Sequence, residues 1–192
     1  LHSVSKAIQA VSTSESIVIS SNTDVIKAAD KLVFPGVGAI KDCMEAFSVD
    51  LRETVLEEID KKPTLAICVG MQMLLESSEE NGGVDCLGFF QGSVDRFPAN
   101  MRDAQEQRLK VPHMGWNEVK GSGELFNKIP NNSHFYLVHS YYAKPNGNTV
   151  GHCLYDINFA AAMAKNNFYG TQFHPEKSDK IGLKIINNFI NL

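Results

Sequence analysis

The stretch Pro63–Leu75 constrains the fold most strongly, because its two halves carry different patterns. A short apolar run of the kind found in buried parallel strands leads into Cys68, and apolar residues at helical spacing follow it. Small residues on both sides, Ala66 and Gly70, allow a very tight turn from strand to helix. The stretch therefore predicts a strand, a sharp corner at Cys68 and a helix.

Two interpretations of Cys68 follow from this position. A corner of this kind exposes the sulfur and places it at the positive end of the next helix, where thiolate is favoured over thiol. Alternatively, a cysteine between Ile67 and Val69 is a small core residue. The stretch taken alone does not favour either interpretation.

Composition narrows the class of protein. The chain has 192 residues, of which 43% are hydrophobic and 21% charged, which is enough for one sizeable core and one domain over residues 1–192. The net charge is -4 and the basic residues are dispersed, so we expect neither nucleic acid nor a membrane surface as a partner.

The cysteines and the apolar runs indicate a compartment. The four cysteines are far apart and form no CxxC pair, which predicts neither a zinc site nor a disulfide framework. No apolar run approaches the roughly 18 residues of a membrane span, and no signal peptide opens the chain. We therefore expect reduced thiols and a cytoplasmic protein.

The first half of the chain alternates helical and strand patterns. We expect helices near 1–11, 21–29, 39–47, 51–61 and after Cys68, and strands near 16–20, 31–34 and 64–68. Because the chain begins inside a helical stripe, we also expect that a first strand and its loop precede residue 1. This alternation predicts a parallel sheet covered on both faces, with ligands at the carboxyl ends of its strands.

The second half has short strand patterns separated by turn residues. We expect strands near 88–94, 117–119, 133–142, 150–153, 159–163 and 168–173, and a closing amphipathic helix at 180–192. These strands are expected as antiparallel additions. The predicted fold is a three-layer α/β/α domain with a mostly parallel central sheet.

His174-Pro175-Glu176 follows the last predicted strand and bears on Cys68. A nucleophilic thiol needs a base, and the base needs an acceptor for its other ring nitrogen; an extended His-x-Glu supplies both. The alternative is a surface turn with an incidental histidine. A zinc-deaminase site is not predicted, because no P-C-x-x-C follows.

Pro35-Gly36-Val37-Gly38 follows another predicted strand. It lacks the third glycine of a dinucleotide fingerprint and the GK[ST] of a phosphate loop, so it is either a simple turn or a backbone donor to an oxyanion. Acyl transfer through a thioester needs two such N–H donors, and the amide after the nucleophile, Val69, is the usual second one.

Together these residues resemble a known family. The motifs that carry the resemblance, in order along nearly the whole chain, are Pro35-Gly36-Val37-Gly38, Ile67-Cys68-Val69-Gly70-Met71-Gln72, Pro112-His113-Met114-Gly115-Trp116-Asn117, His139-Ser140-Tyr141 and Gln172-Phe173-His174-Pro175-Glu176. The set resembles the triad-type, class I glutamine amidotransferases, and most of all the glutaminase subunit of imidazole glycerol phosphate synthase. Ala66 departs from the pattern, since the family usually has glycine there.

The resemblance implies a role for each site residue. Cys68 is the implied nucleophile, His174 the base and acid, and Glu176 the group that orients His174. The implied oxyanion donors are Val37 and Val69; the implied glutamine ligands are Gly38, Gln72, Glu80, Ser140 and Tyr141; the implied partner contacts are Trp116 and Tyr136. The alternatives are that both aromatics are core residues, that Gln72 lies on a helix surface and that Glu80 is a solvated charge.

The resemblance also implies a reaction and a partner. L-Glutamine is hydrolysed without a cofactor or metal, and ammonia passes to a (β/α)₈-barrel cyclase of histidine biosynthesis. Two rivals remain: a hydrolase such as a γ-glutamyl hydrolase, which acts alone, and a catalytically silent binding subunit with the same fold. The segment that begins at Pro112 and carries Trp116 disfavours the first, and the intact triad disfavours the second.

Overall fold

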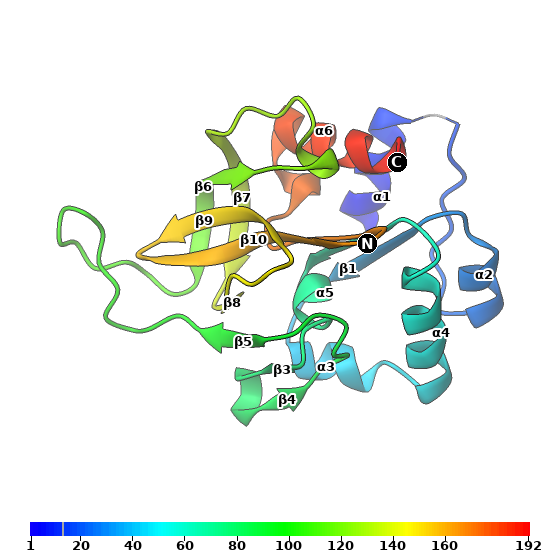
Figure 1. Ribbon diagram of the computed structural model, residues 1–192, viewed down its shortest axis with the longest axis horizontal. Helices are drawn as coiled ribbons and strands as arrows, with labels where there is room; N and C mark the ends of the chain where they lie inside the picture. Colours follow the sequence, from blue (N-terminus) through cyan, green and yellow to red (C-terminus); the bar gives the residue numbers. More distant parts are fainter. Residues whose placement is uncertain (13) are drawn as a thin grey trace.

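A seven-stranded mixed sheet forms the centre of the molecule (Figure 1). The structure is a computed structural model and describes residues 1–12 and 14–192. The strand order is β1-β2-β11-β10-β9-β6-β7. The strands are β1 (Leu32–Gly36), β2 (Thr64–Cys68), β6 (His113–Gly121), β7 (Ser133–His139), β9 (Thr149–Tyr155), β10 (Ile157–Lys165) and β11 (Phe168–Thr171). β2 pairs in parallel with β1 and β11, and the remaining strands add to the sheet in antiparallel pairs.

A smaller sheet lies beside the large one. Its strands are β4 (Val84–Asp85), β3 (Ser77–Ser78), β5 (Ser93–Arg96) and β8 (Tyr141–Ala143), in that order. The single strand predicted for 133–142 is therefore divided at Ser140, where the chain leaves the large sheet and enters the small one. The strand predicted for 88–94 is also shorter than expected, because only its end enters β5.

Helices cover both faces of the large sheet. The α-helices are α1 (His2–Val11), α2 (Thr23–Ala28), α3 (Ile40–Glu45), α4 (Val49–Ile59), α5 (Val69–Gln72) and α6 (Asp179–Ile190), and the 3₁₀ turns are η1 (Glu80–Gly82), η2 (Glu124–Phe126) and η3 (Pro175–Lys177). α1 and α6 lie on one side of the sheet, and α3, α4 and α5 lie on the other (Figure 1). The α/β class and the layered architecture are confirmed, but the described sheet is mixed rather than mostly parallel, because β10, β9, β6 and β7 all join it in antiparallel pairs.

The packing explains why the segment before Cys68 is so apolar. Every residue of β2 is buried, since strands flank it on both edges and helices cover both faces. α6 packs with Ile185, Ile186 and Phe189 inward, as its helical stripe predicts. The core thus fixes the end of β2, and with it Cys68.

The strand predicted for residues 16–20 is wrong. These residues have no strand partner in the part of the chain that the structure describes, and Val18 and Ile19 are 67% and 58% exposed. A short apolar run becomes a strand only when a neighbouring edge satisfies its backbone N–H and C=O groups. No described helix is both long enough and apolar enough to cross a bilayer.

Candidate active site

Parallel register brings three motif-bearing strand ends together. Gly36 at the end of β1 lies opposite Cys68, and Thr171 at the end of β11 lies opposite Ile67. The Pro35–Gly38 loop and the segment 172–176 therefore leave the sheet on either side of the thiol. This edge is where parallel α/β sheets place their ligands.

The corner at Cys68 has the strained backbone expected of a nucleophile elbow. Its φ is 55° and its ψ is -114°, a conformation that non-glycine residues rarely adopt. Two glycines permit the close approach of β1. A Cβ on Gly36 would lie 2.1 Å from the nitrogen of Gly70, and a Cβ on Gly70 would lie 2.2 Å from the carbonyl oxygen of Phe34.

The helix after the corner is shorter than the sequence predicts. α5 ends at Gln72 after four residues, although Met71, Leu74 and Leu75 are all buried as expected. A single turn gives only a small macrodipole, so the helix-dipole contribution that we expected is largely absent. The environment of the sulfur must come mainly from neighbouring side chains and local N–H groups.

His174 and Glu176 form a buried pair beside Cys68. The Nδ1 atom of His174 lies 2.9 Å from Oε1 of Glu176, which leaves Nε2 for the sulfur. Burial lowers the pKa of His174, but the Cys68 sulfur and the Glu176 carboxylate raise it more, to about 9. His174 therefore carries a proton at neutral pH, and its ring lies between Glu176 and the sulfur of Cys68.

Two hydrogen bonds hold the backbone of His174, and one of them comes from Ser178, which no sequence motif indicates. The N–H of His174 donates to the carbonyl of Tyr136 on β7 at 2.9 Å. The buried hydroxyl of Ser178 donates to the carbonyl of His174 at 2.7 Å and accepts from the N–H of Tyr136 at 2.9 Å. No local pattern around Ser178 signals this role, because its partner lies 42 residues away along the chain.

Two glutamines connect the thiol to β8. Nε2 of Gln172 lies 3.6 Å from Sγ of Cys68, and its Oε1 accepts from Nε2 of Gln72 at 2.8 Å. Nε2 of Gln72 also donates to the carbonyl of Tyr141 at 3.0 Å. Gln72 is buried, so the helix-surface alternative is wrong.

Glu80 is placed beside the glycine loop. Its Oε2 accepts from the N–H of Ile40, at the start of α3, at 2.9 Å. Gly38 lies two residues before Ile40, has a φ of +95° and would admit a Cβ without contact. Glu80 is therefore anchored rather than freely solvated, and the structure brings it to the loop that carries Gly38.

Ser140 and Tyr141 lie where β7 passes into β8. The carbonyl of Ser140 accepts from the N–H of Phe97 at 3.0 Å, and the carbonyl of Tyr141 accepts from Gln72. Val69 immediately follows Cys68 and begins α5, whereas Val37 lies in the loop after β1 with 70% of its surface exposed. These positions place the expected substrate and oxyanion residues around one edge of the sheet.

A buried histidine pair supports the carbonyl of Tyr141. His139 Nδ1 lies 2.7 Å from this carbonyl, and His139 Nε2 lies 3.0 Å from Nδ1 of His113. Burial lowers the pKa of His113 to about 4 and that of His139 to about 3, so both rings are neutral. Both histidines stand in the motifs quoted above, but no spacing in the sequence indicates that they pair.

The two aromatic residues expected at a partner surface are neighbours. Trp116 on β6 pairs with Tyr136 on β7, and their ring centroids are 6.2 Å apart. Trp116 is 52% exposed, so the core alternative is wrong for it, whereas Tyr136 is half-buried. Exposed Met114 lies on β6 with Trp116, and exposed Leu154 lies on β9, the next strand in the sheet.

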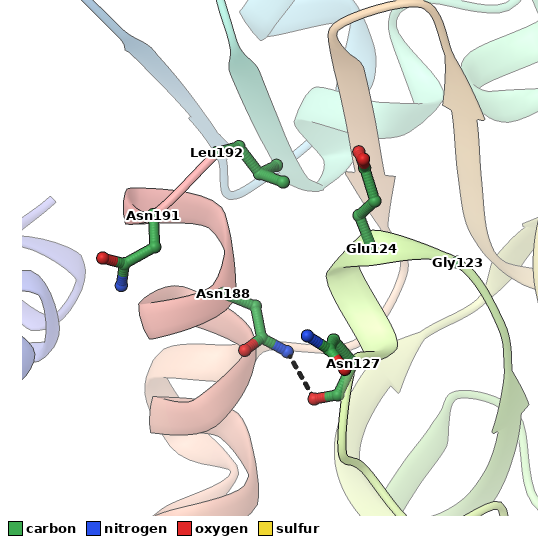
Figure 2. Close-up of a pocket in the computed structure, with 6 residues that line it drawn as sticks. All are labelled: Gly123, Glu124, Asn127, Asn188, Asn191 and Leu192. Atoms are coloured by element: carbon green, nitrogen blue, oxygen red, sulfur yellow. Dashed lines mark hydrogen bonds between the residues drawn. The ribbon is translucent and has the colours of Figure 1, made fainter.

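The pocket drawn in Figure 2 is not this site. It lies between the end of α6 and η2 and is lined by Gly123, Glu124, Asn127, Asn188, Asn191 and Leu192. α6 begins just after the His174 segment and ends beside Lys31, which bonds the carbonyl of Ile190 and precedes β1. The pocket thus lies toward the amino ends of the parallel strands, away from Cys68.

The sequence matches known proteins over almost its full length. Residues 2–192 match the family model described as glutamine amidotransferase class-I. The chain is 49% identical to imidazole glycerol phosphate synthase subunit HisH 1 of Pseudomonas aeruginosa, with 99% of this chain and 91% of that protein covered. It is 46% identical to subunit HisH of Nitrosospira multiformis, with 99% and 92% covered.

Solved structures agree with the fold. A crystal structure titled glutamine amidotransferase superposes with a TM-score of 0.71 at 12% identity, covering 100% of this chain and 94% of that one. A putative GMP synthase subunit from Thermoplasma acidophilum gives a TM-score of 0.68 at 21% identity, covering 99% and 86%. The chain belongs to the class-I glutamine amidotransferases, within the family of imidazole glycerol phosphate synthase subunit HisH.

Proposed function

We propose that this chain hydrolyses L-glutamine to L-glutamate through Cys68, His174 and Glu176, and that it delivers the ammonia to a cyclase subunit in histidine biosynthesis. The observation that carries the proposal is the parallel register of β1, β2 and β11. It sets the strained thiol corner beside a histidine that is hydrogen-bonded to a buried carboxylate.

The first half of the reaction forms a thioester. The Cys68 sulfur attacks the side-chain amide carbon of glutamine, and the carbonyl oxygen becomes an oxyanion held by the N–H groups of Val37 and Val69. His174 then gives its proton to the departing nitrogen, so the C–N bond breaks and ammonia leaves. The raised pKa of His174 supports this step, because the ring already holds a proton at neutral pH.

The second half returns the enzyme to its starting state. His174, now neutral, takes a proton from water, and the hydroxide attacks the thioester carbon. The C–S bond breaks, glutamate departs and the thiolate faces the imidazolium again. Glu176 holds the ring orientation in both halves through its bond to Nδ1.

The amino-acid end of glutamine is bound around the same edge. Gly38, Gln72, Glu80, Ser140 and Tyr141 form this part of the site. Their grouping is supported by the bonds from Gln72 to Tyr141 and from Glu80 to the start of α3. The carboxylate of Glu80 is suited to the α-ammonium of the substrate, and backbone N–H groups of the loop are suited to its carboxylate.

The partner is a (β/α)₈-barrel cyclase that binds the face carrying Trp116 and Tyr136. The exposure of Trp116 and its pairing with Tyr136 support this assignment, because large aromatic side chains commonly anchor interfaces. Tyr136 also holds the backbone of His174, so partner contact and catalysis share one strand. We place the enzyme in the cytoplasm, where biosynthetic glutamine is available.

One assay tests the proposal. Glutamate release is measured for wild type and for Cys68→Ala, each with and without a cyclase subunit, and cyclase turnover is measured with added ammonia. We expect Cys68→Ala to abolish glutamine hydrolysis and to leave ammonia-dependent cyclase turnover intact, whereas Cys153→Ala, in β9, retains hydrolysis. Retained hydrolysis in Cys68→Ala would falsify the proposal. Full activity without a cyclase would favour a hydrolase that acts alone.

A further inference from the structure

We propose that Gln172 is a further catalytic residue, whose side-chain N–H stabilises the Cys68 thiolate and whose orientation is fixed by Gln72. The inference rests on the proposed nucleophilic role of Cys68. Nε2 of Gln172 lies 3.6 Å from the sulfur, a hydrogen-bonding distance for this large atom.

The polarity of the Gln172 amide follows from its neighbours. The carbonyl oxygen of Tyr141 can only accept, so the group of Gln72 that bonds to it at 3.0 Å must be its NH₂. The same NH₂ lies 2.8 Å from the other glutamine, which must therefore present its oxygen there. Gln172 is left with its own NH₂ facing the sulfur, and the alternative amide flip would break this chain of bonds.

Donors and acceptors in the histidine part of this row of hydrogen bonds can be assigned in the same way. The Tyr141 carbonyl also lies 2.7 Å from Nδ1 of His139, so this nitrogen carries a hydrogen and Nε2 accepts. Nε2 in turn receives the hydrogen of His113 Nδ1 at 3.0 Å. Each bond in the row has one donor and one acceptor, and the row ends with a donor at the sulfur.

Burial makes this donor effective. Gln172, Gln72 and Cys68 are all buried, so water competes little for the N–H or for the sulfur. An N–H bond to an anion is stronger than one to a neutral acceptor, so Gln172 favours thiolate over thiol. In deacylation the sulfur departs as a thiolate, and the same bond stabilises it there. No covalent bond of Gln172 forms or breaks during turnover.

This donor complements the other features of the site. α5 has only one turn, so its dipole contributes little to stabilising the thiolate. His174 supplies a positive charge, but it must lose its proton during ammonia release. Gln172 keeps both of its hydrogens throughout, so its N–H is already in place when the sulfur departs as a thiolate in deacylation.

The test uses the reactivity of Cys68 toward iodoacetamide as a function of pH. Labelling of Cys68 is read by peptide mass spectrometry against Cys43, Cys86 and Cys153. In Gln172→Met, which keeps length but has no donor, we expect the pH profile of Cys68 labelling to move up by about one pH unit, the effect of one hydrogen bond to a charged group. Gln172→Glu keeps the bond to Gln72 but turns an oxygen toward the sulfur, so it should move the profile further.

Thr171→Val is the matched control. Thr171 adjoins Gln172, is fully buried, and its hydroxyl has no partner among the residues that the structure describes. We expect this variant to retain the wild-type labelling profile and glutaminase activity. An equal shift in Thr171→Val would overturn the inference, because it would assign the effect to packing.

The outcomes separate this inference from the proposed function. A wild-type labelling profile in Gln172→Met, in a protein that melts as wild type does, would overturn the role of Gln172 while Cys68→Ala still tests the nucleophile. If Gln172→Met does not fold, the isosteric Gln172→Glu is used instead. An unchanged rate of Cys68 labelling at neutral pH would overturn the inference, and a labelling rate at least tenfold lower would support it.

Discussion

At the scale of single residues, the site depends on where a proton resides. His174 lies between two groups that raise its pKa, and burial alone would have moved that pKa in the other direction. The bond from Nδ1 to Glu176 fixes the ring and leaves Nε2 for the sulfur. In the proposed mechanism, the position of the proton therefore depends on a pair of residues only two positions apart.

Glu176→Gln tests this pair. Loss of the carboxylate should lower the pKa of His174 from about 9, so the basic limb of the pH–rate profile should move to lower pH. We expect turnover to fall by roughly 10²-fold, less than the roughly 10⁴-fold of the corresponding serine-triad substitution, because a thiol depends less on its base. The measurement is glutaminase kcat against pH in complex with the cyclase. Glu57→Gln, on the exposed side of α4, is the control, and wild-type turnover in Glu176→Gln would exclude Glu176 from the triad.

Val37 offers a backbone test at the same scale. Its side chain is 70% exposed, so Val37→Ala should change turnover little. Val37→Pro deletes the N–H and should lower kcat by about 10²- to 10³-fold, the usual effect of losing one oxyanion donor. KM for glutamine and the thermal midpoint are measured in parallel. Equal losses in the two variants would assign the effect to the side chain and contradict the oxyanion role.

At the scale of elements, the neighbouring strands β6 and β7 both position residues around the site. β7 holds the His174 backbone through Tyr136, carries His139 and ends where Ser140 directs the chain into β8. β6 contributes His113 to the same buried cluster, in which the His113 ring stacks on Tyr155 with centroids 3.9 Å apart. The strands that form the proposed partner face therefore also support the substrate side of the site.

The histidine pair gives this region a pH-dependent stability. Burial holds the pKa of His113 at about 4 and that of His139 at about 3, below the value near 6.5 of the unfolded chain. As pH falls below 6.5, the unfolded chain takes up protons that the folded protein does not, so folding stability decreases. His174 has the opposite effect on folding stability, because its pKa is raised. Its contribution to stability is present below pH 6.5 and is lost as pH rises toward 9.

His113→Gln tests the acid side of this dependence. The slope of unfolding free energy against pH between about 5 and 6 should become shallower by about one proton, or about 1.4 kcal/mol per pH unit. Urea unfolding at several pH values gives this slope. His134→Gln, at an exposed position of β7, should retain the wild-type slope. An unchanged slope in His113→Gln would show that His113 is protonated in the folded protein.

At the scale of the whole molecule, the parallel and the antiparallel strands of the sheet have different roles. The parallel strands β1, β2 and β11 set the thiol, the glycine loop and the base at one edge, and the antiparallel strands extend the sheet toward the Trp116 face. A partner bound on that face would contact the strand whose Tyr136 carbonyl holds His174. Coupling between the two subunits is thus expected through β7.

Trp116→Ala tests this partner face. With 52% of its surface exposed, Trp116 should contribute little to folding, and the thermal midpoint should fall by no more than about 4 °C. Binding to the cyclase, measured by calorimetry, should weaken at least tenfold, as for other aromatic anchors. Trp116→Phe should retain most of the affinity. A collapse of the thermal midpoint would instead make Trp116 a core residue.

Local patterns in the sequence determined the elements and the chemistry. The apolar run before Cys68, the small residues beside it and His174-Pro175-Glu176 are all local signals, because each depends only on neighbours along the chain. They predicted the elbow and a base with its orienting carboxylate, and the alternation of helical and strand patterns predicted the α/β class; the structure shows the strained corner and the 2.9 Å bond.

Only the tertiary structure decided the contacts that join distant segments. Three of these contacts are hydrogen bonds that no local pattern encodes. They join Gln72 to Gln172, His113 to His139 and Ser178 to Tyr136, which are 100, 26 and 42 positions apart along the chain. The same reason explains the wrong strand at 16–20. Its apolar run is a local preference, but a strand also requires a neighbouring edge, and pairing is a property of the folded sheet.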